Sequence, residues 1–452
     1  MRNIQKLIAI FLLISVTSCT KDDTFIDTTK DENLNIKAKN GGGINSQTFI
    51  PGNLPVYSQN EFVIQFKDGT PDSMKFTIRE SNGIDGDNIN PQQGFGSFEI
   101  CKCDNPDFEK WIFPPGTISI EPKKQVIEGQ IGGEIFGIAD IDYEFEFGFD
   151  VESPILGTAA DTNYESYIKP SNNGITVALL DTGLAPALTV FSESTFEPQF
   201  LYNATVDEFA ESEAQSGWDF VDNDPNTFDD DPFKHGSIIG DLIHNALANL
   251  EIKHQILPLK IADSNGNISY FATICSLVYA SERSDIINAS FGWHGDPFGD
   301  FGNTIFENVL EMFPDVILVA SAGNTSHNND TTPHYPSSFN KPNVIAVGSC
   351  NQGYGRASDF SNYGTSVDFF TKGEGISFYG SFVSGTSFAA PQITIEVAKI
   401  LNSGELSELT MTQRVASLGI PVTLEFMTVT DLYTGEEVVK NTLHNRYILA
   451  ED

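Results

Sequence analysis

Uninterrupted apolar runs in the second half of the chain constrain the fold more than any other feature. They occupy residues 175–180, 316–320 and 344–347, and stretches with helical periodicity lie between them. Continuous apolar strands are covered by helices on both faces, whereas alternating strands have one solvated face. From about Pro154 onward, the pattern therefore predicts an α/β domain with a mostly parallel sheet, whose functional loops follow the carboxyl ends of the strands. The tail adds strand material around Asp431–Gly435.

A smaller α+β unit is predicted ahead of this domain, over residues 55–150. Its strand patterns lie at 62–67, 98–103, 110–113 and 138–145. A short helix begins near Thr70 and stops at Gly83, a residue type that is common at helix ends. Cys101 and Cys103 fall in the second strand pattern, where they read as small strand residues, although their spacing would also suit a metal site or a strained bridge.

The first residues have the pattern of a secretory signal. Arg2 and Lys6 precede an apolar run that is too short to span a bilayer, and the sequence leads directly to Cys19. This resembles the bacterial lipoprotein signal, which implies removal of residues 1–18 and a lipid on Cys19. An ordinary cleavage site with an incidental cysteine is the alternative. The acidic residues that follow resemble a surface-export tag, so we expect the outer membrane or cell surface, with 19–54 as a flexible tether.

Composition excludes one class of partner and one kind of scaffold. The chain has 62 acidic against 25 basic residues and a net charge of -37, so an electrostatic surface for nucleic acid is excluded. Five cysteines in 452 residues are too few for a disulfide scaffold, and a hydrophobic core must hold the fold. We expect the membrane to be a partner only through the lipid anchor, and we take the protein as a monomer.

Three separate residues have settings that suit nucleophilic catalysis. Asp181 ends an apolar strand; an aspartic protease would need a second Asp-Thr-Gly or Asp-Ser-Gly, which the sequence lacks, and a simple helix or turn cap is the other interpretation. His235 begins a helical pattern, and the other six histidines lack this setting. Ser387 lies among small residues where a helix begins, and a helix N-terminus favours developing negative charge. A serine needs such a base and acid to become nucleophilic.

The order Asp, His, Ser, together with Gly-Thr-Ser-x-Ala-x-Pro around the serine, resembles the subtilase family of serine proteases. The likeness extends over about 154–403 and includes Asp359–Gly364 and the stretch Val319–Asn324. It implies a three-layer subtilisin-like fold, with the peptidase domain at residues 154–452. It also implies a serine endopeptidase that needs no cofactor.

The same resemblance assigns roles to individual residues. Asp181, His235 and Ser387 would form the triad, and Asn324 would donate a hydrogen bond to the oxyanion. The implied substrate is a protein or peptide that lies as an added strand between two backbone edges. The residues implied to bind it are Ser290, Phe291, Gly292, Gly266, Ser321, Ala322 and Gly323. Because the last three are small and uncharged, they suit a pocket for a sizeable apolar side chain.

The chain departs from the family pattern around the histidine. The family usually has His-Gly-Thr-His-Val-Ala-Gly, whereas residues 237–241 differ here, and Asp181 and His235 are far enough apart to predict an inserted loop at 191–217. The acidic residues before the histidine would suit a structural calcium ion, and a solvated loop explains them equally well. They are Asp222, Asp224, Asp229, Asp230 and Asp231. No other metal is expected.

Residues 55–150 resemble, in position and strand-helix-strand order, the inhibitory propeptide of many subtilases. The resemblance implies a zymogen that is cut near residues 153–158, which would release the mature protease from its anchor unless the propeptide stays bound. A protein-binding accessory domain is the alternative. Among whole functions, the altered histidine helix keeps open a catalytically impaired binding lipoprotein on the same fold. A serine esterase would show a Gly-x-Ser-x-Gly elbow, which is absent around Ser387.

Overall fold

The computed structural model describes most of the chain from residue 55 onward. The described residues are 55–88, 94–102, 105–130, 137–146, 150–151, 164–187, 199–295, 304–378, 381–405, 407–431 and 434–450. The predicted signal peptide, Cys19, the tether and the predicted cut at 153–158 lie outside these stretches. Within them, no helix combines the length and the apolar character needed to cross a bilayer.

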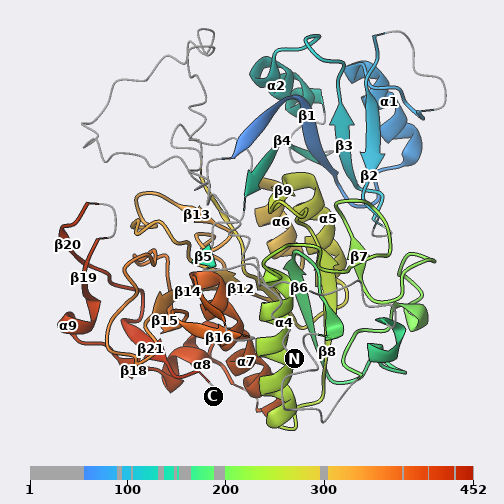
Figure 1. The fold of residues 1–452 in the computed structure, drawn as a ribbon. Coiled ribbons are helices and arrows are strands. Elements are labelled where there is room, and N and C mark those ends of the chain that lie inside the picture. The colour runs from blue at the N-terminus through green and yellow to red at the C-terminus, as the bar shows by residue number, and fades with distance from the viewer. Residues whose placement is uncertain are drawn as a thin grey trace, which may run out of the picture. The chain divides into compact units, whose positions relative to one another are not determined.

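In the described part of the chain, a nine-stranded sheet lies at the centre of the larger domain (Figure 1). Its order is β18-β21-β15-β14-β12-β10-β6-β8-β7, and every neighbouring pair is parallel except β18 with β21. The strands are β6 Ile175–Asp181, β7 Trp218–Asp219, β8 His254–Lys260, β10 Ile286–Ala289, β12 Ile317–Ser321, β14 Val344–Cys350, β15 Phe369–Lys372, β18 Ile420–Pro421 and β21 Arg446–Ile448. The predicted mostly parallel α/β domain is therefore confirmed.

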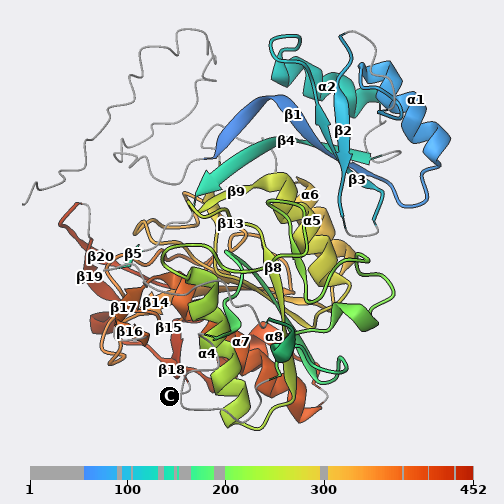
Figure 2. The ribbon, with the colours of Figure 1, turned by 45° about the vertical axis from the view of Figure 1, so that its right-hand side comes forward.

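Helices cover both faces of this sheet, which makes three layers (Figure 2). The main helices are α4 His235–Asn249, α5 Tyr270–Ser281, α6 Thr304–Met312, α7 Thr386–Ser403 and α8 Met411–Leu418. Along β6, Val177 and Leu179 pack into the core that contains α4 and α7. Ala178 and Leu180 point the other way, into the core that contains α5 and α6. Apolar side chains on both faces explain why these strands read as uninterrupted apolar runs.

In its described residues, the N-terminal unit is an antiparallel sheet with two helices. Its elements are β1 Val56–Phe66, α1 Asp72–Asn82, β2 Ser97–Ile100, β3 Phe108–Ile112, α2 Ile120–Gln130 and β4 Gly137–Glu146. Gly83 ends α1 with φ of 80°, a conformation that costs glycine little. The strands occur in the order β2-β3-β1-β4-β9, where β9 (Asn267–Ser269) comes from the larger domain. The predicted α+β unit is present, and α2 is an addition to it.

Short elements complete the described chain. They are β5 Asp150–Val151, η3 Tyr164–Tyr167, η4 Ala204–Val206, β11 Trp293–His294, β13 His334–Tyr335, β16 Ile376–Phe378, β17 Ser381–Ser384, α9 Leu424–Met427, β19 Thr428–Thr430 and β20 Glu437–Val439. The strand material predicted around Asp431–Gly435 lies on either side of these residues, in the antiparallel pair β19 and β20. Gly435 itself has φ of 72°, and its N–H donates to the Asp431 carbonyl at 2.9 Å.

The cysteines near β2 are also arranged differently from the prediction. Cys101 forms a disulfide with Cys275, which is 174 residues away in the sequence and lies in α5. Cys101 is therefore not available for a metal site or a bridge with Cys103, and Cys103 lies outside the described residues.

Candidate active site

Asp181 and His235 meet at the carboxyl edge of the central sheet. Asp181 is the last residue of β6, and His235 is the first residue of α4. Both side chains are completely buried, and His235 Nδ1 lies 2.7 Å from Asp181 Oδ1. Because a carboxylate accepts this bond, Nδ1 carries the proton and Nε2 is the basic nitrogen of the neutral ring. Burial acts to lower the pKa of His235, but the charge and the hydrogen bond of Asp181 outweigh burial and raise that pKa.

Acidic residues of the preceding loop bind the first backbone N–H groups of α4. The His235 N–H donates to Asp231 Oδ2 at 3.1 Å, and the Ser237 N–H donates to Asp229 Oδ2 at 3.0 Å. The Ser237 hydroxyl donates to the same Asp229 oxygen at 2.6 Å. Ser237, which departs from the family pattern, therefore anchors the start of the helix through Asp229. Sequence reasoning assigned no such role to Asp229 or Asp231; their position just before the helix was the available signal.

Gly236 allows this helix to begin directly against the turn after β6. A Cβ added to Gly236 would lie 2.2 Å from the carbonyl oxygen of Gly183. The Gly236 N–H donates to the Thr182 hydroxyl at 2.9 Å. The close approach of two backbones therefore requires glycine at position 236, and it holds His235 over Asp181.

Ser387 lies in the first turn of α7. Its backbone carbonyl accepts a 2.7 Å hydrogen bond from the Ser290 hydroxyl. The ring of the next residue, Phe388, lies 5.4 Å from the ring of His235. The first turns of α4 and α7 are therefore adjacent, and they bring Ser387 and His235 to the sheet edge where Asp181 ends β6.

Asn324 follows β12 and is held by the start of α7. Its Oδ1 accepts hydrogen bonds from the backbone N–H and the hydroxyl of Thr386, both at 2.8 Å. A Cβ added to Gly385 would lie 3.4 Å from Asn324 Nδ2, so the amide donor faces the segment just before Ser387. Sequence reasoning missed Thr386 as a positioning residue, although its place beside the serine in the Gly-Thr-Ser motif was a signal.

The residues predicted to bind substrate lie mostly after β10 and β12. Those after β10 are Ser290, Phe291 and Gly292, and those at the end of β12 and after it are Ser321, Ala322 and Gly323. The Ser321 hydroxyl donates to the Phe291 carbonyl at 3.3 Å, which joins the two segments. Gly266 lies in a turn, with φ of 85°, immediately before β9. The structure therefore brings six of the seven residues together, and it places Gly266 beside a strand that already pairs with β4.

An imidazole faces two of the predicted pocket glycines. A Cβ added to Gly292 would lie 2.2 Å from His334 Cε1, and one added to Gly323 would lie 2.8 Å from His334 Cδ2. Burial, together with the neighbouring ring of His294 at 5.3 Å, lowers the pKa of His334 well below its usual value, so the ring is neutral. Sequence reasoning took His334 as structural, and no motif marks it. The ring therefore lies against both glycines, on the side where a Cβ would point.

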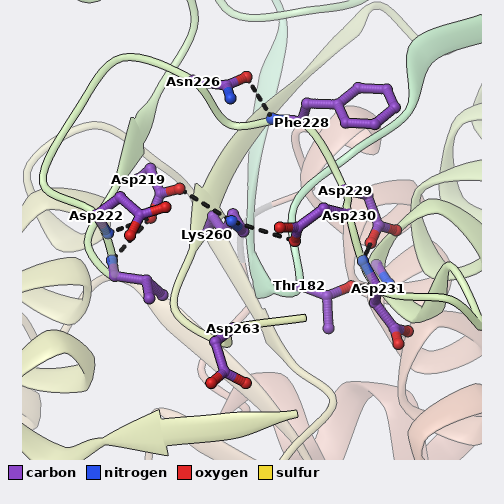
Figure 3. A network of polar contacts seen from close by, with 12 residues as sticks. Thr182, Asp219, Asp222, Asn226, Phe228, Asp229, Asp230, Asp231, Lys260 and Asp263 are labelled. Atoms are coloured by element: carbon purple, nitrogen blue, oxygen red, sulfur yellow. Dashed lines mark hydrogen bonds and ion pairs between the residues drawn. The ribbon is translucent and has the colours of Figure 1, made fainter. Parts of the chain in front are cut away.

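Three of the five aspartates that were considered for calcium, Asp229, Asp230 and Asp231, have other partners, and Figure 3 shows Asp230 beside Lys260. Lys260 Nζ lies 3.1 Å from Asp219 Oδ2 and 3.2 Å from Asp230 Oδ1, while Asp229 and Asp231 bind the start of α4. Among the residues that the structure describes, no three His, Cys, Asp or Glu side chains are grouped so that they could hold a metal ion.

Comparison with curated proteins places these residues in a known context. Residues 172–418 match the model of the subtilase family. A thermophilic serine proteinase of Bacillus sp. (strain AK1) is 32% identical over 202 residues, which are 42% of this chain and 47% of that protein. Subtilisin of Bacillus pumilus is 30% identical over 203 residues, which are 42% of this chain and 70% of that protein. The chain thus spans about half the length of the first of these relatives.

A solved structure supports the fold over a longer stretch. Fervidolysin from Fervidobacterium pennivorans, a keratinolytic enzyme related to subtilisin, superposes with a TM-score of 0.52 at 16% identity, covering 89% of this chain and 61% of that one. This likeness concerns the fold alone, which is subtilisin-like with a mostly parallel central sheet. Since the family model covers more than half of its length, this chain belongs to the subtilase family.

Proposed function

We propose that this protein is a serine endopeptidase that hydrolyses peptide bonds in proteins. The observation that carries the proposal is the buried pair of His235 and Asp181, 2.7 Å apart, at the edge where Ser387 begins α7. Ser387 Oγ attacks the peptide carbonyl, His235 Nε2 takes its proton and returns it to the leaving amine, and Asp181 stabilises the imidazolium. The Asn324 amide and the Ser387 backbone N–H stabilise the oxyanion.

The loop before α4 supports this assignment electrostatically. Besides Asp181, the charges of Asp231 and Asp229 also raise the pKa of His235. Because the site is buried, these charges stabilise the imidazolium that forms when Ser387 gives up its proton. The rival function, an impaired binding lipoprotein, relied on the altered helix residues. Ser237 now has a partner in Asp229, so no observation favours that rival.

We also propose that residues 55–150 form the inhibitory domain of a zymogen. β4 presents two buried carboxylates to the N-termini of two peptidase helices. Asp142 Oδ1 accepts from the Phe271 N–H of α5 at 3.2 Å, and Asp140 Oδ2 accepts from the Ile305 N–H of α6 at 2.7 Å. Helix N-termini favour negative charge, so these contacts support a dedicated docking surface over a loosely attached accessory domain.

β4 also lies along the edge next to the predicted substrate site. It pairs with β9 in antiparallel register, with Phe145 opposite Ile268. The Phe145 ring stacks at 6.1 Å on the ring of Phe291, one of the predicted substrate-binding residues. An extended substrate would add to the same kind of edge, so the position of β4 supports self-inhibition.

We place the protein outside the cytoplasm, with a lipid anchor on Cys19. The signal pattern of the first residues supports this, and so does the disulfide between Cys101 and Cys275, because such bonds persist in oxidising compartments. The triad chemistry needs no organic cofactor, and the proposed partner is a protein or peptide substrate.

The test is mass spectrometry of the wild type and of Ser387→Ala, both expressed from residue 20 onward. Each protein is incubated alone and then with a denatured protein substrate. In the presence of dithiothreitol, we expect only the wild type to be cut between its N-terminal unit and the peptidase domain and to hydrolyse the substrate. Ser403→Ala, an exposed serine at the other end of the same helix, should behave like the wild type. Undiminished proteolysis by Ser387→Ala would refute the proposed triad.

A further inference from the structure

A covalent bond joins the N-terminal domain to the peptidase domain. It links Cys101, which follows β2, to Cys275 in α5, and the two Cα atoms lie 5.3 Å apart, within the usual range for disulfides. Both cysteines are buried. Phe271, one turn before Cys275, is the residue whose N–H binds Asp142. The disulfide and the carboxylate contact therefore hold the same helix.

We propose that this disulfide keeps the N-terminal domain covalently attached to the enzyme after the maturation cut, until the bond is reduced. The inference rests on the proposed maturation cut near residues 153–158. That cut lies between Cys101 and Cys275 in the sequence, so each product contains one of the two cysteines. Hydrolysis of the peptide bond leaves the S–S bond intact, and the product is two chains with one covalent link.

The link changes how inhibition can end. A cleaved inhibitor that is held only by contacts such as those of Asp140 and Asp142 is lost by dilution once it dissociates. A tethered inhibitor stays at an effective concentration of the order of millimolar, so the same contacts re-form after each opening. The domain therefore leaves the peptidase only when the disulfide is broken, and the anchor proposed at Cys19 stays attached to the enzyme until then.

Breaking the bond requires an external dithiol. One of its thiolates attacks a sulfur of the disulfide, its second thiol resolves the mixed disulfide, and the products are thiols on Cys101 and Cys275 and an oxidised dithiol. The structure provides an approach, because both cysteines line a cavity of about 330 Å³.

No described cysteine can perform this exchange from within the protein. Cys350 is the free cysteine in the described part of the chain, and it is buried in the peptidase domain. Burial raises the pKa of its thiol, so it stays protonated and unreactive.

The test compares masses with and without reductant. The wild type is expressed from residue 20 under disulfide-forming conditions, allowed to process itself, denatured, and treated with an alkylating agent. Without dithiothreitol we expect one species with the mass of the whole chain plus one water and the alkyl groups on its free cysteines, and with dithiothreitol two fragments. Cys275→Ser should give two fragments in both conditions, and the control Cys103→Ser should behave like the wild type. Wild-type fragments that separate without reductant would overturn the proposal.

A second protein separates this inference from the maturation proposal. If the wild type never cuts itself, the proposed maturation cut is wrong, but the disulfide link between the two domains can still be tested. A site for a sequence-specific protease is inserted between Val151 and Tyr164 in the Ser387→Ala chain, which is then cut from outside. The two parts must remain joined in denaturant without reductant. If they separate, or if both Cys101 and Cys275 are alkylated before reduction, the disulfide link is wrong.

Discussion

The two helices that carry the proposed triad begin in different ways. The start of α7 matches the family motif, and it is tied to Asn324 through Thr386. The start of α4 departs from the family motif after Gly236, and it is tied to Asp229 and Asp231 of the preceding loop. At the start of α7 the small residues allow backbone groups to approach the reacting atoms, so few other residue types fit at these positions. At the start of α4 the altered side chain, Ser237, only anchors the helix, and any nearby hydrogen-bond acceptor can provide that anchor.

The largest effect is expected on the α7 side, from Asn324→Ala. This change removes the oxyanion donor and leaves the triad in place, so turnover should fall about 10²- to 10³-fold with little change in KM. The measurement is kcat and KM on a peptide substrate. Thr386→Ser keeps the hydroxyl that binds Asn324 Oδ1 and serves as the control, with turnover close to the wild type. An Asn324→Ala enzyme with unchanged kcat would contradict the proposed oxyanion site.

The second prediction concerns pH and the α4 side. Burial raises the pKa of Asp229 to about 7, against the hydrogen bonds from Ser237, which lower it. The folded protein therefore binds this proton more tightly than the unfolded chain, where the pKa is about 4. Stability from this group is present at low pH and is lost as the pH rises from about 4 to about 7. We expect a loss of about 2 to 3 kcal/mol in unfolding free energy between pH 5 and pH 8.

Urea unfolding of the inactive Ser387→Ala protein, with and without Asp229→Asn, measures this loss. An amide does not titrate, so the double variant should lack that part of the pH dependence. Asp230→Asn, in which the half-exposed partner of Lys260 is changed, is the control and should keep the slope. Equal slopes for Ser387→Ala and the Asp229→Asn double variant would contradict a buried Asp229 that takes up a proton on folding.

A smaller effect is expected from Ser237→Ala. The substitution removes two hydrogen bonds, one donated to Asp229 and one accepted from the Ala185 N–H at 2.9 Å. It should lower the unfolding free energy by about 1 to 2 kcal/mol and leave kcat nearly unchanged. Ser417→Ala, at an exposed helix position, is the control and should stay within about 0.5 kcal/mol of the wild type. If kcat fell as much as it does in Asn324→Ala, substitutions at the starts of α4 and α7 would affect turnover equally, which would contradict the proposed difference between the two helices.

The smallest effect concerns His334, which no motif marks although it lies next to motif glycines. His334→Gly should enlarge the space between Gly292 and Gly323. Two peptide substrates are compared, one with Phe and one with Ala immediately before the scissile bond. We expect the ratio of their kcat/KM values to shift about 10-fold in favour of Phe. His327→Gln is the control, because its ring contacts His294 and not these glycines. A wild-type preference for Phe, or an unchanged ratio in His334→Gly, would show that the ring does not restrict the pocket.

Many of the strands and helix ends could be predicted from the sequence, because they depend on residues that are close together in the chain. The apolar runs became β6, β12 and β14, and Gly83 ended α1 as expected. Helix α2 was not predicted, although its Pro122 lies in the first turn, where a proline is well tolerated. The strand material expected around Asp431–Gly435 lies in β19 and β20, on either side of these residues.

By itself, the sequence determined the α/β class, the family and the residues proposed for catalysis, since each depends on a contiguous motif or periodic run. Only the tertiary structure decided which distant residues meet. The pairing of Cys101 with Cys275, the contact of Asp229 with Ser237 and the position of His334 between two glycines are of this kind. Such contacts depend on how strands and helices pack, and no spacing along the chain encodes that packing.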